Sequence, residues 1–290
     1  MMNVIIGARS RLGRSLAQFL SLDRSILLDR KIYDEWWREN SADKISYFFE
    51  DLHKKWRVNT GEQTPVLFVP AGILDPNRSE REHIQVNFSL AKNIIEGAGR
   101  LGFQTVTFGT VMETLIGSQT SNPYIASKTR LGDYVTDYSV KHATALHIRL
   151  HTLYGVGLPS PFMFLGQVLH ALLHHIDFKM SPGNQLREYH HIDDDVRALI
   201  NLVLLKKSGV IELSHGQPLT LKALAHYIFA AFGCLELLQV GALSEPLKDN
   251  CHQVFSRSTF LRDETFRDSF PAIVSYLRSC LQYIKEGEHV

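Results

Sequence analysis

The first half of the chain alternates short apolar runs with longer helical patterns, and this alternation limits the fold more than any other feature. Six runs have the length and composition of buried strands: 3–6, 25–28, 45–49, 66–69, 105–108 and 146–149. Three segments between them have helical periodicity: 11–22, 80–101 and 124–141. Strands that alternate with helices form βαβ units, so the sequence predicts an α/β fold with a doubly wound parallel sheet.

The regular alternation ends at Gly155–Pro161, where two glycines and two prolines interrupt the pattern. Beyond it, three segments have helical patterns: 162–173, 221–232 and 271–285. We expect residues 1–155 to form the main domain, with 188–212 returning to it. Residues 156–187 and 213–290 should form a smaller part at the carboxyl edge of the sheet, where open α/β sheets bind ligands.

Composition excludes several classes of function. The 31 Lys and Arg residues balance 30 Asp and Glu residues, so a net charge of +1 provides no field to attract nucleic acid or an anionic membrane. Cys234, Cys251 and Cys280 have no disulfide or zinc spacing, and the histidines, including the pairs at 174–175 and 190–191, have no recognisable metal-ligand spacing. No signal-peptide pattern and no bilayer-spanning apolar stretch is found. We therefore expect a cytoplasmic protein without a metal.

A glycine-containing turn joins the first predicted strand to the first predicted helix. Backbone N–H groups in such a turn, and the helix N-terminus after it, bind the pyrophosphate of a dinucleotide. Gly7 would form the turn, Gly13 would let the helix pack on the strand, and Ser10 replaces a middle glycine. Two glycines alone are also compatible with a purely structural turn. The candidate cofactor contacts here are Gly7, Arg9, Ser10, Arg11, Leu12 and Gly13.

The end of the second predicted strand bears on the choice between NAD and NADP. Asp29 stands where a carboxylate would accept hydrogen bonds from an adenosine ribose, which favours NAD. Arg9, Arg11 and Arg30 stand where guanidinium groups would pair with a 2′-phosphate, which favours NADP. These arginines are equally compatible with a solvated surface, so the sequence indicates NAD or NADP without deciding between them.

Tyr124 and Lys128 are four residues apart in a segment with helical periodicity. This spacing places both side chains on one face of a helix, where an ammonium group favours the ionised form of a phenol. A phenol whose pKa is lowered in this way exchanges protons near neutral pH, so the pair is a candidate acid/base site. The same spacing also arises by chance on an ordinary amphipathic helix.

With this pair and the glycine turn, the chain resembles the extended short-chain dehydrogenase/reductase family, in the NAD-dependent epimerase/dehydratase branch that acts on nucleotide sugars. The resemblance covers nearly the whole chain and implies a Rossmann fold. Tyr124 and Lys128 match the family's Tyr-x-x-x-Lys, and Thr110 matches its catalytic Ser or Thr. Other residues resemble the family's cofactor contacts. Asp51 and Leu52 follow the third predicted strand, Ala71 and Gly72 follow the fourth, and Asn87 lies in the next predicted helix.

A second match covers residues 187–194, where Arg-Glu-Tyr-His-His-Ile-Asp-Asp resembles the family's Arg-Asp-Phe-Ile-His-Val-Asp-Asp, with His190 as the marked departure. The resemblance implies that Arg187 contacts the diphosphate of a nucleotide sugar, which suits its planar fork of donors. The acidic residues 193–195 are expected to cap a helix and form its first turn. Thr152 replaces the family's usual Asn and is a candidate substrate contact, and His151 beside it is expected to be a packed strand histidine.

The resemblance implies hydride transfer from NADH or NADPH to a keto group, at C4, of a nucleotide-linked deoxysugar. Tyr124 would protonate the developing alkoxide, Thr110 would hydrogen-bond the same oxygen, and Lys128 would hold the nicotinamide ribose. The family's dehydratases follow the Thr with an Asp-Glu pair, where this chain has Val111 and Met112. Its 3,5-epimerase/reductases carry a Cys soon after the Ser or Thr, and this chain has none before Cys234.

Two alternatives stay open. The first is a nucleotide-sugar 4-epimerase that holds NAD tightly and reduces its own intermediate. The second is a non-catalytic dinucleotide-binding sensor or scaffold, which the replacement at Ser10 would suggest. As partners, the resemblance implies a nucleotide-sugar substrate and, as one candidate assembly, a homodimer that pairs the helix carrying Tyr124 with a neighbouring helix.

Overall fold

The structure, a computed structural model, describes residues 2–21, 25–60, 64–75, 77–116, 120–244 and 249–287. The chain forms two compact units. Unit 1 comprises Met1–Leu150 and Val196–Leu213, and unit 2 comprises His151–Asp195 and Ser214–Val290. Each unit buries a hydrophobic cluster of its own.

Unit 1 is built on a parallel sheet of six strands. In sheet order they are β10 (Gly209–Glu212), β5 (Ala145–Leu150), β4 (Gln104–Thr110), β3 (Val66–Val69), β1 (Asn3–Ile6) and β2 (Ser25–Leu28). All residues of β1 and β3 are buried, as expected for parallel strands whose two faces are both covered. The chain passes from β1 to β2 on one side and to β3 on the other, so the strand order reverses between β1 and β3. Ligands of such sheets bind at the carboxyl ends next to this point.

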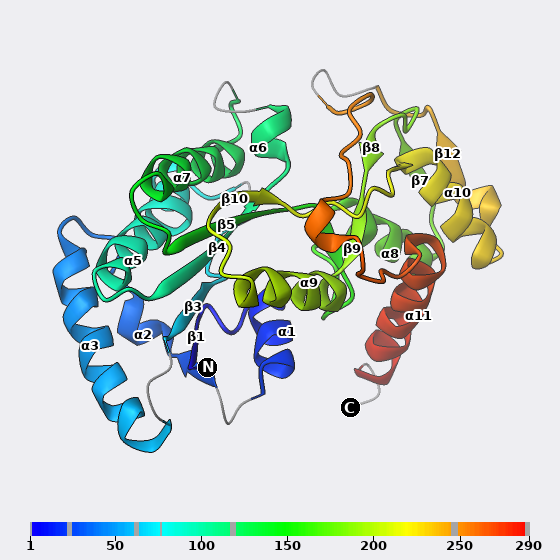
Figure 1. Ribbon diagram of the computed structural model, residues 1–290. Helices are drawn as coiled ribbons and strands as arrows, with labels where there is room; N and C mark the ends of the chain where they lie inside the picture. Colours follow the sequence, from blue (N-terminus) through cyan, green and yellow to red (C-terminus); the bar gives the residue numbers. More distant parts are fainter. Residues whose placement is uncertain are drawn as a thin grey trace. The chain divides into compact units, whose positions relative to one another are not determined.

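Helices cover both faces of this sheet, which confirms the predicted doubly wound fold. Figure 1 shows α5 (Leu90–Gly99) and α7 (Pro123–Ser139) on one face and α1 (Arg11–Phe19) on the other. The shorter helical segments of unit 1 are α2 (Arg30–Tyr33), α4 (Glu80–His83), the π-helical η2 (Ile84–Ser89) and α6 (Met112–Leu115).

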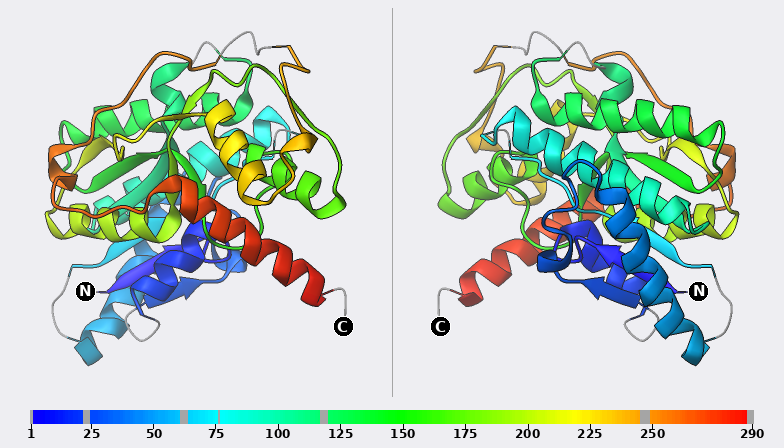
Figure 2. Two further views of the ribbon diagram at one scale, coloured as in Figure 1. Left: turned by 90° about the vertical axis from the view of Figure 1, so that its right-hand side faces the viewer. Right: turned by 90° about the vertical axis from the view of Figure 1, so that its left-hand side faces the viewer.

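The predicted strand at 45–49 is wrong, because these residues lie inside helix α3 (Ser41–Thr60). Ala42, Ile45 and Phe49 are buried at the helical spacing i, i+3 and i+7, and a short apolar run by itself does not distinguish a strand from a helix. Helix α3 lies beside α5 in the right-hand view of Figure 2, and a Cβ atom at Gly97 of α5 would be 2.6 Å from the Ala42 carbonyl oxygen. The sixth strand is β10 instead.

Unit 2 combines pairs of short strands with helices. Its strand pairs are β6 (Thr152–Tyr154) with β9 (Tyr189–His191), β7 (Phe178–Met180) with β12 (Leu238–Val240), and β8 (Leu186–Arg187) with β11 (Leu219–Thr220). Its helical segments are α8 (Phe164–His174), α10 (Leu221–Ala231), η4 (Leu235–Leu237), η5 (Thr259–Leu261) and α11 (Ser269–Gly287). Helix α9 (Ile192–Leu204) begins in unit 2 and continues in unit 1. Helix α11 packs on both α8 and α10 in the core of unit 2, and all three helices lie close to their predicted positions.

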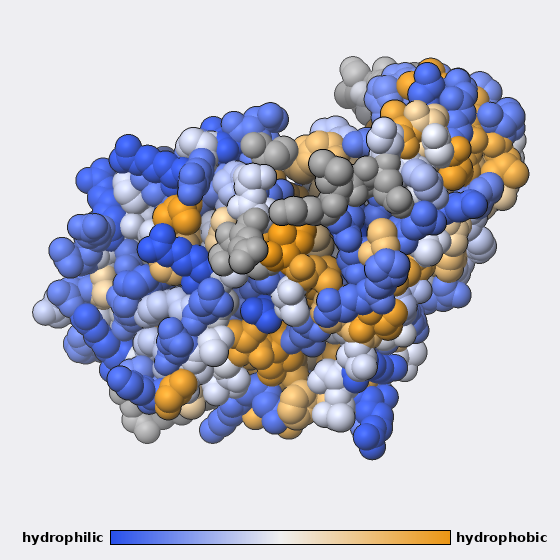
Figure 3. Space-filling model, turned by 90° about the horizontal axis from the view of Figure 1, so that it is seen from above, coloured by the Kyte–Doolittle hydropathy of each residue, from blue (hydrophilic) through white to orange (hydrophobic). Residues whose placement is uncertain are grey.

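The surface of unit 1 is mainly hydrophilic on the left-hand side of Figure 3. Helix α3 of this unit also carries exposed i,i+4 ion pairs, with 2.8 Å between Lys54 and Glu50 and 2.7 Å between Lys55 and Asp51. Within the described residues, we find no helix that combines the length and the hydropathy needed to cross a bilayer.

Candidate active site

The turn after β1 has the backbone shape that its glycines allow. Gly7 has a φ of 103°, and a Cβ atom there would lie 2.5 Å from the backbone nitrogen of Ala71. A Cβ atom at Gly13 would collide with the Gly7 carbonyl oxygen, so glycine lets α1 approach the turn. Ser10 caps α1, and its hydroxyl accepts a hydrogen bond from the Gly13 N–H at 3.0 Å. Ser10, which replaces the middle glycine of the motif, therefore stabilises the N-terminus of α1.

The electrostatics of this turn fit an anionic ligand. The first turn of α1 contains no acidic residue, and Arg11 is its first residue. The positive end of a helix dipole and a neighbouring guanidinium both attract phosphate. The predicted contacts Arg9, Arg11 and Leu12 all belong to this turn or to the helix start.

Asp29 and Arg30, two of the candidate residues for the choice between NAD and NADP, lie on the surface directly after β2. Asp29 caps α2 by accepting the Lys31 N–H at 2.9 Å, and its carboxylate is 3.9 Å from Arg9. Arg30 pairs with Asp34 at 3.1 Å. Exposed pairs of this kind contribute little free energy and exchange partners readily. The geometry is therefore open to either a ribose hydroxyl or a 2′-phosphate.

Asp51 and Leu52 do not follow a strand, as the sequence analysis expected. Both residues lie in the middle of helix α3, where Asp51 pairs with Lys55. The expected placement after a third strand is wrong, and with it the geometric reason for assigning these two residues to the adenine. We leave them out of the proposed cofactor site.

The turn after β3 and the π-helical segment η2 meet at Asn87. The Asn87 amide accepts a hydrogen bond from the Ile73 N–H at 2.8 Å, donates to the Ile73 carbonyl at 3.0 Å, and donates to the Ser127 hydroxyl at 3.1 Å. A Cβ atom at Gly72 would lie 3.2 Å from Asn87 Oδ1 and 3.6 Å from Lys128 Nζ. Asn87 thus holds the backbone at Ile73, directly after Ala71 and Gly72, close to the lysine that the sequence predicts to be catalytic.

Tyr124 and Lys128 lie in the first two turns of α7, next to the end of β4. Asn122 caps the helix by accepting the backbone N–H groups of Tyr124 at 3.0 Å and Ile125 at 3.3 Å. Lys128 is buried, and its ammonium donates to the Phe108 carbonyl at 2.7 Å. Thr110, the last residue of β4, is two positions further along the same strand. The structure therefore ties the helix of the Tyr-Lys pair to the strand end that carries Thr110.

The expected lowering of the Tyr124 pKa is wrong for the protein by itself. Burial raises the pKa of the Tyr124 phenol, and the negative charge of Glu113 raises it further. Burial lowers the pKa of Lys128 to about 8, and Glu113 opposes that shift only in part. At neutral pH the phenol is protonated, which is the form that donates a proton.

Glu113, in the short helix α6, is a residue of this site that the sequence analysis missed. Its carboxylate is fully buried, accepts the Thr110 backbone N–H at 2.7 Å and the Arg149 Nε–H at 3.0 Å, and lies 3.3 Å from His147 Nε2. Burial acts to raise the pKa of Glu113, but the hydrogen bonds and charges of His147, Thr110 and Arg149 outweigh it, so the pKa is lowered. Glycine at 109 leaves room for the carboxylate, because a Cβ atom there would collide with it.

The two predicted substrate contacts outside this cluster belong to unit 2. The Thr152 N–H donates to the Glu188 carbonyl at 3.1 Å, which pairs β6 with the chain before β9. Arg187 is ion-paired with Asp249 at 2.5 Å and donates to the Leu186 carbonyl at 2.8 Å. A diphosphate would therefore have to compete with Asp249 for this guanidinium. Of the acidic residues 193–195 in the first turn of α9, Asp194 pairs with Arg267 at 2.8 Å.

A family model decides the relationship of this chain to known proteins. The model of the NAD dependent epimerase/dehydratase family matches residues 4–212. The chain belongs to this family. No curated protein matches it in sequence.

Several solved structures share the fold at low sequence identity. A UDP-N-acetylglucosamine 4-epimerase from Methanobrevibacter ruminantium M1 is 13% identical with a TM-score of 0.74, over 99% of this chain and 98% of that one. The dTDP-glucose 4,6-dehydratase DesIV from Streptomyces venezuelae, solved with NAD, is 16% identical with a TM-score of 0.73, over 99% and 98%. RMD from Pseudomonas aeruginosa, solved with NADPH, is 13% identical with a TM-score of 0.70, over 96% and 99%.

Proposed function

We propose that this family member is an oxidoreductase that transfers a hydride from NADH or NADPH to the C4 keto group of a nucleotide-linked deoxysugar. The observation that carries the proposal is the bond between Lys128 and the Phe108 carbonyl, which holds the Tyr124 helix against the strand end of Thr110. Tyr124, Lys128 and Thr110 are thereby held in one part of unit 1, where they could act together on a substrate carbonyl oxygen and on the cofactor. The family membership supports the same class of substrate.

The residues of unit 1 fit a nicotinamide dinucleotide, which would supply the hydride when bound. The Gly7 turn and the start of α1 would receive its phosphates, because they offer a helix N-terminus without acidic side chains. The Gly72 turn, held by Asn87, would line its path toward Lys128. The Lys128 ammonium has three protons and uses one for Phe108, so it keeps donors for the ribose hydroxyls.

Tyr124 would supply the proton that completes the reduction. Its raised pKa keeps the hydroxyl protonated at neutral pH, so it can donate to an oxygen on which negative charge develops. The Thr110 hydroxyl would hydrogen-bond the same oxygen and fix its direction. The positive charge of Lys128 nearby would stabilise the phenolate left behind.

The surroundings of Thr110 argue against dehydration. Positions 111 and 112 hold Val and Met, which cannot move protons. Glu113 is the nearest acid along the chain, but its carboxylate is buried and accepts hydrogen bonds from the Thr110 backbone and Arg149. A carboxylate that holds the backbone in this way is not available as the proton shuttle that elimination requires.

The deciding experiment incubates the protein with 4-deuterated NADH or NADPH and a set of nucleotide-linked 4-keto-hexoses, and follows the label by mass spectrometry. Stoichiometric deuterium in the product supports the reductase and identifies the preferred coenzyme. Interconversion of two hexoses without net coenzyme consumption would favour the 4-epimerase. Dinucleotide binding without turnover of any substrate would favour the non-catalytic sensor.

Variants on α7 test the assigned roles. Replacing Tyr124 by Phe should lower kcat by about 10²- to 10⁴-fold, the usual contribution of a general acid, and leave dinucleotide affinity nearly unchanged. Tyr134→Phe is the matched control, because Tyr134 lies on the same helix but donates to Glu96 at 3.0 Å, away from the β4 end. Equal activity of the two variants would refute the role of Tyr124.

A further inference from the structure

Unit 2 contains a buried cluster of three histidines and two carboxylates that the proposed reaction does not use. Its members are His151, Glu188, His190, Asp195 and His215. Glu188, His190 and Asp195 are only 3%, 1% and 0% exposed. Buried ionisable groups are rare unless they are paired or bind a metal, so this cluster calls for a specific explanation.

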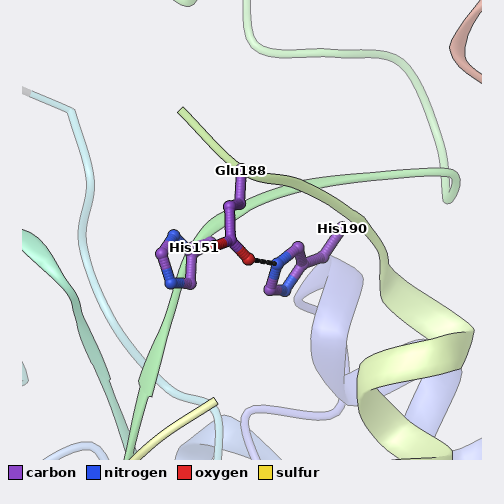
Figure 4. A group of neighbouring side chains, drawn as sticks. All are labelled: His151, Glu188 and His190. Carbon is purple, nitrogen blue, oxygen red and sulfur yellow. Dashed lines mark hydrogen bonds and ion pairs between the residues drawn. The ribbon is translucent and has the colours of Figure 1, made fainter. Parts of the chain in front are cut away.

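Three of these side chains lie close together. Figure 4 shows the Glu188 carboxylate between the rings of His151 and His190. One ligand atom from each residue lies within 4.8 Å of the other two, and His190 Nε2 is 3.0 Å from Glu188 Oε2. Zn²⁺ binds such atoms at about 2.0–2.2 Å, so neighbouring ligands of a tetrahedral ion are separated by about 3.3 Å. The His151 Nε2 atom is buried, and no hydrogen-bond partner for it is found among the described residues.

The atoms around this triad hold its ligands in the way that metal sites require. His190 Nδ1 is 3.1 Å from the Asp195 carboxylate, so that bond directs the other nitrogen, Nε2, toward Glu188. Metal-binding histidines are usually oriented by such a carboxylate. The Glu188 oxygens in turn accept hydrogen bonds from the Ser214 hydroxyl and from the backbone N–H of His215, both at 2.8 Å.

A second group of three, His190, Asp195 and His215, also lies close together but has the wrong geometry. The rings of His190 and His215 are stacked 3.4 Å apart and inclined by 1°. A metal ion is bound by the nitrogen lone pair, which lies in the plane of the ring. One ion cannot lie in two parallel planes, so His215 packs on His190, and on Phe266 on its far side, without chelating an ion.

The charges of the cluster agree with a divalent cation. Burial acts to lower the pKa of His190, but Asp195 and Glu188 outweigh it and raise that pKa to about 9, so in the metal-free protein the imidazolium neutralises one of the two carboxylate charges. A divalent ion that displaces this proton neutralises both charges, and a set of two histidines and one carboxylate leaves a fourth position for water. We propose that His151, Glu188 and His190 bind a divalent transition-metal ion of the Zn²⁺ class, with Asp195 as the residue that orients His190. The ion cross-links β6 to β9, since His151 precedes β6 and the other two residues flank or belong to β9.

The test measures metal binding by the full-length protein. After dialysis against EDTA and then against metal-free buffer, Zn²⁺ is titrated in competition with a colorimetric chelator, and bound zinc is counted by mass spectrometry. We expect one equivalent per chain and a rise in melting temperature on adding Zn²⁺. Co²⁺ in its place should give the visible absorption of a four-coordinate site.

Three variants locate the ion. His151→Phe removes one ligand and keeps an aromatic ring beside Phe255, 5.2 Å away, so it should keep its circular dichroism spectrum and lose tight binding. Asp195→Asn should weaken affinity by about 10- to 100-fold, the usual effect of losing the group that orients a ligand. The control, His170→Gln with His174→Gln, removes an exposed histidine pair on α8, with rings 4.5 Å apart, that could bind metal adventitiously.

The control variant should bind as the wild type does. Zinc binding that is equal in the wild type and in His151→Phe overturns the proposal, as does loss of binding in the α8 variant. Absence of a melting-temperature shift in a wild type that retains its fold overturns it as well.

Discussion

Replacing Glu113 by Gln should destabilise unit 1 far more than its conservative size suggests. Gln fills the same space, but the Glu113 carboxylate accepts from two fixed donors, the Thr110 N–H at 2.7 Å and the Arg149 Nε–H at 3.0 Å. A Gln side chain has one acceptor oxygen, and its NH₂ group would face one of these donors. Arg149 would also lose the negative charge that compensates it.

The size of the effect follows from burial. Removing one partner of a buried ion pair costs about 3–5 kcal/mol, because the other charge is left without compensation. The Glu113 side chain is 0% exposed, but that of Arg149 is 21% exposed, so water relieves part of the penalty. We therefore expect a loss of about 3 kcal/mol, at the lower end of this range.

Urea unfolding followed by tryptophan fluorescence measures this loss, because Trp36, Trp37 and Trp56 all belong to unit 1. With a slope of about 1–3 kcal/mol per molar urea, the midpoint should fall by at least about 1 M. The matched control is Glu35→Gln, whose ion pair with Arg38 spans 2.6 Å but leaves both side chains more than half exposed. It should cost no more than about 1 kcal/mol.

The pH dependence of the same measurement has a definite sign. The pKa of Glu113 is lowered in the folded state from its ordinary value of 4.5, so its stabilising effect is present above that value and is lost as pH falls through the folded pKa. The difference between wild type and Glu113→Gln should shrink below that value. If Glu113→Gln costs no more than Glu35→Gln at pH 7, the assignment of a buried, charge-compensating carboxylate is refuted.

Two other substitutions give independent tests. Lys128→Met should abolish turnover yet stabilise the ligand-free protein at pH 7 by up to about 3 kcal/mol, since burial lowers the pKa of Lys128 from 10.5 to about 8. The unfolded chain binds the Lys128 proton more tightly than the folded chain does. The stability of the wild type relative to Lys128→Met should therefore rise between pH 8 and 10.5. If urea unfolding shows the same difference in stability across that pH range, the assignment is contradicted. Gly13→Ala should weaken NADH and NADPH binding in fluorescence titrations by at least about tenfold, because its Cβ would force α1 away from the Gly7 carbonyl; unchanged affinity would show that the turn does not hold the phosphates.

Local sequence patterns determined most of the parallel sheet and the placement of the Tyr-Lys pair. Strands such as β1 and β3 are continuous apolar runs because both of their faces are buried, and the turn at Gly7 requires a residue without a side chain. The i,i+4 spacing of Tyr124 and Lys128 follows from helix geometry alone. These features depend on neighbours in the chain, so the sequence was sufficient to find them.

Only the tertiary structure decided three other features. Residues 45–49 form part of helix α3, which packs on α5. The short apolar run in the sequence does not indicate that contact. Donors from β4 and β5 lower the pKa of Glu113, and the negative charge of Glu113 adds to the burial that raises the pKa of Tyr124. His151, Glu188 and His190 meet although the first is remote in sequence from the other two, because the parallel pairing of β6 with β9 brings them together. Charges and packing act between residues that are close in space. A sequence pattern reveals these interactions only when the interacting residues are also close in the sequence.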